Sequence, residues 1–122
     1  MMWDGIRARK FPRINYKCRI QVQKSGREET VDTHTENIGQ GGICVSLAEN
    51  LGIFADVTLE MFIGEEEYMI KSGGKIVWVV KGHPTGKGEE VKYDTGIEFT
   101  DIRKKDLEKI EQLVREKIGS DT

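Results

Sequence analysis

Alternating apolar and polar residues predict a series of short β-strands along most of the chain. In residues 16–23 one face is formed by Tyr16, Cys18, Ile20 and Val22, a period of two that is typical of a half-buried strand. Similar runs, bounded by turn residues, predict further strands over residues 29–38, 43–47, 56–63, 68–80 and 93–99. Because no helical pattern separates these runs, we expect the strands to pair in antiparallel fashion.

The pattern changes to a helical period near the end of the chain. Residues 102–118 carry apolar side chains at helical spacing, with Asp101 as the expected N-cap and Gly119 just past the end. The fold class predicted from these elements is mainly β: a six-stranded antiparallel barrel or sandwich, closed by one C-terminal amphipathic helix.

The length of 122 residues is sufficient for one domain and one core. No apolar run approaches the roughly 20 residues that a membrane helix needs. The first residues have no apolar segment typical of a signal peptide. We therefore expect a cytoplasmic protein without membrane insertion.

The residues that usually carry catalysis or metal binding are sparse. Cys18 and Cys44 lack CxxC spacing and lie in β-patterned runs, where a thiol is usually a small apolar side chain. His34 and His83 form no zinc-binding pattern, and no nucleophile motif is present. We therefore expect neither an enzyme nor a metal site.

Charge is distributed unevenly along the chain. Residues 1–27 contain eight basic residues and one aspartate, a net charge of +7, whereas the remainder has a net charge of −9. This asymmetry predicts an anionic partner near the N-terminus, with a solvated arm as the equally simple alternative. Within it, Arg7, Arg9, Lys10 and Arg13 surround Phe11 and Pro12. A guanidinium group can bind phosphate or a guanine edge with two hydrogen bonds.

A second candidate segment is the polar and glycine-rich stretch 35–43 between two predicted strands. The glycines of Gly39-Gln40-Gly41-Gly42 let a ligand approach the backbone closely, and Asn37 offers both a donor and an acceptor. A plain hairpin turn or bulge explains the same residues.

Taken together, the two segments resemble the PilZ domain, a family of bacterial receptors for cyclic di-GMP. The family's RxxxR motif is matched by Arg9 to Arg13, and its [D/N]xSxxG motif is matched in part by Asn37 to Gly42. Residues 93–99 and the helix after them resemble the family's last strand and C-terminal helix. The resemblance runs from about Arg7 to the end of the chain.

This resemblance implies a PilZ-like split barrel over residues 14–122 and a basic, flexible arm over residues 1–13. Arg9 and Arg13 would bind the phosphates and guanine edges, with Arg7 and Lys10 assisting. Asn37 and the turn through Gly42 would contact the other side of the nucleotide. Gly39 stands where the family has serine, and a missing ligand hydrogen bond costs about 0.5–1.5 kcal/mol, or roughly 2- to 10-fold in affinity.

The leading hypothesis is a cyclic di-GMP receptor and adaptor. Nucleotide binding would order the arm and signal to an unidentified protein partner in motility, adhesion or biofilm control, with the protein a monomer or a ligand-linked dimer. The alternative is a nucleotide-independent PilZ-like interaction module in pilus or flagellar function. A single-stranded nucleic-acid binder is a third reading, which the low aromatic content and acidic body disfavour.

Overall fold

The computed structural model describes residues 12–82 and 91–120, which form seven strands and one helix. The strands are β1 (Arg13–Asn15), β2 (Arg19–Lys24), β3 (Val31–Gly39), β4 (Gly42–Leu47), β5 (Asp56–Ile63), β6 (Tyr68–Lys81) and β7 (Tyr93–Asp101). The helix is α2 (Lys104–Ser120). Most bounds agree with the sequence prediction to within two residues.

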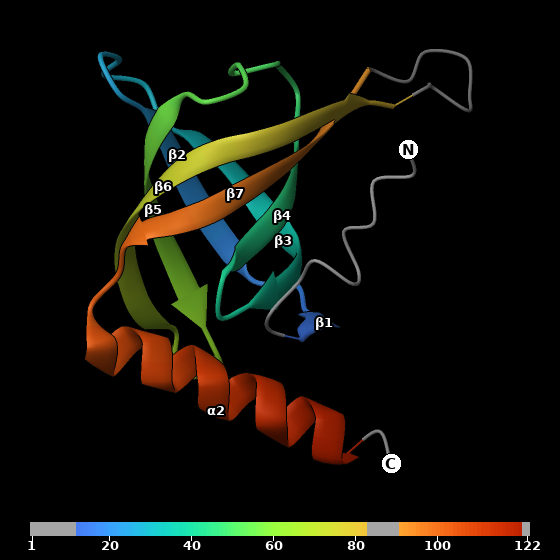
Figure 1. Ribbon diagram of the computed structural model, residues 1–122, viewed down its shortest axis with the longest axis vertical. Coiled ribbons are helices and arrows are strands. Elements are labelled where there is room, and N and C mark those ends of the chain that lie inside the picture. Colours follow the sequence, from blue (N-terminus) through green and yellow to red (C-terminus); the bar gives the residue numbers. More distant parts are fainter. Residues whose placement is uncertain (1–11, 83–90, 121–122) are drawn as a thin grey trace.

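Six of these strands form a closed antiparallel barrel, as the sequence predicted. The order around the ring is β3, β2, β5, β6, β7 and β4, and the pairing of β4 with β3 closes it. The long strand β6 pairs with β5 through its first half and with β7 through its second half. Helix α2 lies across the lower end of the barrel (Figure 1).

Alternation along the strands fills the inside of the barrel with aliphatic side chains. Ile20 and Val22 of β2 and Leu59 and Met61 of β5 are all completely buried. The helix adds Ile110 and Val114 to the same core. Burial of this apolar surface is the main term that stabilises the fold, and the helix closes an end that would otherwise expose it.

The first predicted strand is wrong in its bounds. Residues 16–18 are not part of a strand, and they separate the short β1 from β2. Because Asn15 pairs with Asn37 and Arg19 with His34, these three residues lie opposite only Thr35 and Glu36 of β3, so the chain has one extra residue here. On the other side of β3, the register against β4 shifts between Thr35 and Asn37 and leaves Glu36 as an extra residue. The Thr35 hydroxyl accepts a hydrogen bond from the Cys18 amide at 3.0 Å and donates one to the Tyr16 carbonyl at 2.7 Å.

The predicted N-cap of the helix is also wrong. Asp101 is the last residue of β7, and the carbonyl of Arg103 accepts the first helical hydrogen bond, from the Leu107 amide at 2.9 Å. The carboxylate that organises this end is Asp106, in the first turn and fully buried. It accepts hydrogen bonds from the Tyr68 hydroxyl at 2.9 Å and from Arg103 Nε at 3.1 Å. Asp106 thus ties the helix to β6.

Asp106→Ala is expected to destabilise the protein by about 2 kcal/mol, because the substitution removes the hydrogen bonds from Tyr68 and from the Arg103 cation and leaves a small cavity. Urea unfolding followed by circular dichroism measures the loss. Asp101→Ala, at an exposed aspartate of the same connection, is the matched control and should stay within about 0.5 kcal/mol. Equal effects for both variants would contradict the anchoring role of Asp106.

Candidate functional site

Two of the motif residues predicted from the sequence meet on the outside of the barrel. Arg13 begins β1 and lies opposite Gly39, and its Nη1 donates a hydrogen bond to Asn37 Oδ1 at 3.3 Å. These residues are 24 positions apart in the sequence, and the antiparallel pairing of β1 with β3 brings them together. Arg7, Arg9 and Lys10 lie outside the described residues.

A row of paired positions extends from this contact across the outer wall of the barrel. Asn15 lies opposite Asn37, Asn37 opposite Cys44, Cys44 opposite Gly96, and Gly96 opposite Trp78. The Trp78 ring packs against Gly96 so closely that a Cβ at this glycine would overlap it. The wall therefore has polar and cationic groups at one end and a half-buried indole at the other.

The glycine-rich turn is shorter than the sequence suggested. Gly39 is the last residue of β3 and Gly42 the first of β4, so only Gln40 and Gly41 lie between the strands. Gly42 is buried, and a Cβ there would fall on the carbonyl oxygen of Ile97 in β7. At Gly39 a Cβ would lie 2.7 Å from the carbonyl oxygen of Pro12 and 2.9 Å from Cγ of Arg13. Both glycines therefore permit close contact between neighbouring strands.

Acidic side chains flank the row of paired positions. Burial, together with repulsion by the neighbouring carboxylate of Asp94 and a hydrogen bond with it, raises the pKa of Glu36 above its ordinary value of 4.5. Burial and the charges of Glu36 and Asp94 raise the pKa of the Cys44 thiol to about 11, although Arg13 acts in the opposite direction. At neutral pH the Cys44 thiol therefore stays protonated and unreactive. Its side chain is buried within the outer wall.

Sequence reasoning missed Asp94, Trp78 and the position of Glu36. Asp94 and Trp78 come from strands that follow the glycine turn by about fifty and forty residues, so only the register of the barrel places them beside it. The signal for Glu36 was its position directly before Asn37, but the extra residue in β3 could not be inferred from the pattern.

Two further features bear on what this part of the chain can bind. Among the described residues, no group of three or more His, Cys, Asp or Glu side chains is placed to hold a metal ion. No helix in residues 12–82 or 91–120 is long and apolar enough to cross a membrane.

Residues 7–116 match the PilZ domain family, and the chain belongs to this family. The resemblance inferred from the two motifs is therefore confirmed. No curated protein sequence matches the chain.

Several solved structures share the fold. The Bacillus subtilis inhibitor of motility (MotI/DgrA) has a TM-score of 0.73 at 24% identity, over 93% of this chain and 53% of that one. The PilZ domain of YcgR from Escherichia coli, solved with c-di-GMP, has a TM-score of 0.67 at 15% identity, over 91% and 97%. The K. pneumonia MrkH complex with c-di-GMP has a TM-score of 0.71 at 16% identity, over 90% and 51%. The chain thus spans about half the length of MotI/DgrA and MrkH.

Gly39→Ser introduces the family's serine and tests the close contact between β1 and β3. We expect a stability loss of about 1–3 kcal/mol, because the new Cβ meets backbone and side-chain atoms of Pro12 and Arg13. Urea unfolding measures this loss. Gly82→Ser is the control for the general cost of replacing glycine, since a Cβ there makes only an ordinary contact, 3.4 Å from the Lys92 carbonyl oxygen. An unchanged stability for Gly39→Ser would show that β1 moves aside freely.

Asp94→Asn is expected to lower the pKa of Glu36 toward 4.5, because it removes the neighbouring negative charge. A carboxyl whose pKa is raised on folding binds its proton more tightly in the folded state, so its contribution to stability is lost as pH rises through that pKa. As pH rises above 4.5, the free energy of unfolding of this variant should therefore fall less than that of the parent protein. Carboxyl carbon NMR titration of Glu36 measures the shift. Glu98→Gln, on the same strand as Asp94, should leave the pKa of Glu36 unchanged.

Proposed function

We propose that this protein is a cyclic di-GMP receptor that acts as an adaptor, and that the nucleotide binds on the outer wall formed by β1, β3, β4, β7 and β6. The observation that carries this proposal is the hydrogen bond between Arg13 and Asn37, which joins the two PilZ motifs on one surface. YcgR and MrkH, which share the fold, were both solved with this nucleotide.

Each group on the wall has a chemical role in this proposal. Arg13 supplies a planar cation that matches a phosphate or the edge of a guanine, and Arg9 supplies the second. Arg7 and Lys10 add positive charge to the same arm. Asn37 keeps its amide NH₂ as a donor, because its Oδ1 already accepts from Arg13. The indole of Trp78 offers an aromatic surface on which a base can stack.

Gly39 and Gly42 have a less direct role in this proposal. They allow β1 and β7 to approach the β3–β4 turn, and so they set the shape of the surface on which the nucleotide lies. The hydroxyl that the family's serine provides is replaced by the close passage of Pro12 and Arg13 over Gly39. The absence of a side chain at Gly39 therefore leaves no empty space, because Pro12 and Arg13 occupy it.

A receptor of this kind passes its signal through a second molecule. We infer that residues 1–13 close over the nucleotide and that a protein partner recognises the liganded state, in the cytoplasm and without catalysis. MotI is an inhibitor of motility by name, and motility, adhesion or biofilm control is the process proposed here. The protein would be a monomer, or a dimer formed on nucleotide binding.

A nucleotide-independent interaction module is the second candidate. The observation that favours it is the pair of carboxylates, Glu36 and Asp94, beside Arg13. They offset part of the positive charge that an anionic ligand would require. In this case the same wall would bind protein.

Isothermal titration with cyclic di-GMP tests the proposal, with GTP and cyclic di-AMP as comparison ligands. The parent protein should bind cyclic di-GMP selectively and saturably. Arg13→Ala should weaken binding by about 10- to 100-fold, because a hydrogen bond to a charged group contributes about 1.5–3 kcal/mol. Asn37→Ala should weaken it by about 2- to 10-fold, as expected for a neutral hydrogen bond.

Arg27→Ala is the matched control, since Arg27 is an exposed arginine that pairs with Glu49 at 2.9 Å on another part of the barrel. This variant should bind as the parent does. Equal affinity of the Arg13 and Arg27 variants would place the nucleotide elsewhere. A parent that binds no cyclic di-GMP would leave the interaction module as the function.

A further inference from the structure

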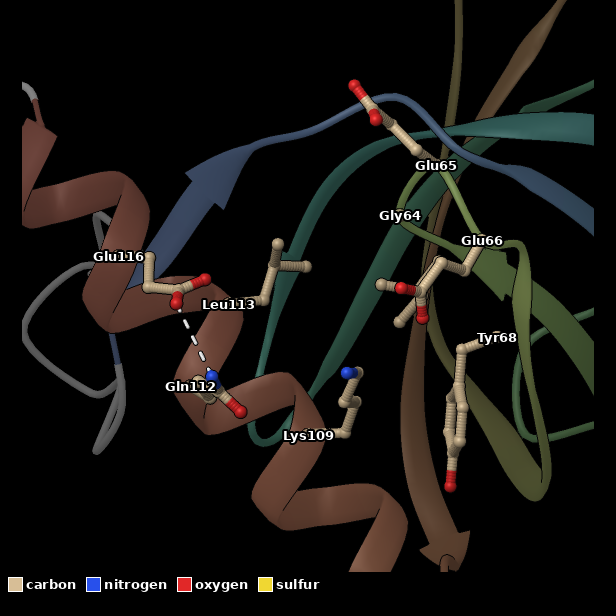
Figure 2. A pocket seen from close by; sticks show the side chains of 9 residues that line it. Gly64, Glu65, Glu66, Tyr68, Lys109, Gln112, Leu113 and Glu116 are labelled. Carbon is tan, nitrogen blue, oxygen red and sulfur yellow. Dashed lines mark hydrogen bonds between the residues drawn. The ribbon is translucent and has the colours of Figure 1, made fainter.

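A groove of about 300 Å³ lies between the β5–β6 turn and α2, at the end of the barrel that the helix covers. Its floor is apolar. Ile63 is only 2% exposed, and Leu113 packs against the core from the helix side. In Figure 2, Leu113 projects from the helix toward the turn and Glu66 projects from the turn toward the helix. The groove is therefore open to a side chain that enters between them.

The turn that forms one wall of the groove is held in place on both sides. The Gly64 amide donates a hydrogen bond to the Tyr16 hydroxyl at 2.9 Å, and the Glu67 amide donates one to the Gly64 carbonyl at 3.1 Å. Glu67 also pairs with Arg19 at 3.6 Å. Both Gly64 and Glu67 have positive φ angles, 78° and 52°. A non-glycine residue in this conformation is uncommon, and here the surrounding hydrogen bonds maintain it.

The rim of the groove is acidic and lacks cationic partners. Glu65 and Glu66 on the turn and Glu116 on the helix line it, and within the described ranges none of them forms an ion pair. Glutamates next to the groove differ, since Glu67 pairs with Arg19 and Glu111 with Arg115. The rim therefore keeps a concentrated negative charge.

The one lysine that lines the groove forms no ion pair with these glutamates. The Lys109 ammonium lies over the Tyr68 ring, 5.3 Å from its centre, and not against the glutamates. In Figure 2 Lys109 and Tyr68 lie together at one end of the groove, while Glu116 lies further along the helix. A basic side chain from another molecule could therefore meet Glu66 and Glu116 without displacing an existing ion pair.

We propose that this groove docks a basic segment of a partner protein, with one leucine-sized side chain on the floor of Ile63 and Leu113 and lysine or arginine residues on either side of it. An apolar contact flanked by opposite charges gives both affinity and selectivity at such a surface. This inference rests on the proposed function, because it supplies the surface through which the receptor meets its partner.

A hydrogen bond connects the helix of the groove to the nucleotide motif. Gln40, in the turn between β3 and β4, donates to Glu111 Oε2 at 2.6 Å. Glu111 lies on α2 between Lys109 and Leu113, both of which line the groove. A nucleotide that moves the β3–β4 turn would therefore act on the helix through this contact. The docking groove and the nucleotide wall remain separate surfaces.

NMR titration of the isotope-labelled full chain tests the docking proposal. The probe is the peptide acetyl-Arg-Lys-Leu-Lys-Arg-amide, added to protein with and without cyclic di-GMP. The expected result is a set of saturable shifts at Gly64, Glu66, Gln112 and Leu113. A peptide with serine in place of leucine should bind about fivefold more weakly, and one with glutamates in place of the basic residues should cause no shifts.

Two double variants separate the groove from the general acidity of the protein. Glu66→Gln with Glu116→Gln should weaken peptide binding by about fivefold, because two ion pairs are lost. Glu29→Gln with Glu108→Gln, a matched pair of exposed glutamates outside the groove, should leave it unchanged. Equal weakening by both pairs, or shifts spread over the acidic surface, would overturn the proposal.

Other occupants of the groove give different results. Groove resonances that move on dilution of the protein alone would assign the groove to a second copy of the chain. Resonances that move only when Arg7, Arg9 and Lys10 are replaced by serine would assign it to the chain's own N-terminal segment. Either result overturns docking of a partner. Cyclic di-GMP titration of the same samples tests the proposed function separately, since nucleotide binding does not require that the groove bind the peptide.

Discussion

The pairing of β4 with β3 is the constraint on which the rest of this structure depends. It closes the ring of six strands, and in the same step it places Asn37 beside Cys44 and brings the wall from β1 to β6 into one surface. Gly39 and Gly42, at the two ends of the β3–β4 turn, have no side chains where Pro12 and Ile97 approach. The same two glycines thus let β1 and β7 lie close to the turn and complete the candidate nucleotide surface.

The distribution of charge also restricts which partners each surface can bind. The basic residues gather near the N-terminus, and the barrel and helix carry the acidic excess. On the outer wall Arg13 lies near Glu36 and Asp94, so its field is partly offset. At the helix end of the barrel, none of Glu65, Glu66 and Glu116 forms an ion pair within the described residues, and three carboxylates face the single lysine of the groove. The two surfaces therefore favour partners of opposite charge, a nucleotide on one and a basic segment on the other.

The sequence predicted the elements of the fold well, because each follows from local periodicity. The strand over residues 56–63 has the bounds that its pattern indicated. Errors arose where tertiary contacts decide the outcome. Residues 16–18 leave the strand because they lie opposite only two residues of β3, and Arg103 replaces Asp101 at the helix start. Of the candidate site, the motifs identified Arg13 and Asn37. Asp94 and Trp78 could not be found, because only barrel register brings them to that wall.

A crystal structure of the full chain with cyclic di-GMP would test the central claim most directly. The account predicts the nucleotide on the outer wall, with the Arg13 guanidinium within hydrogen-bonding distance of a phosphate or a guanine and the Asn37 amide in contact with the ligand. A nucleotide bound away from β1 and β3, with Arg13 still paired only to protein atoms, would contradict it.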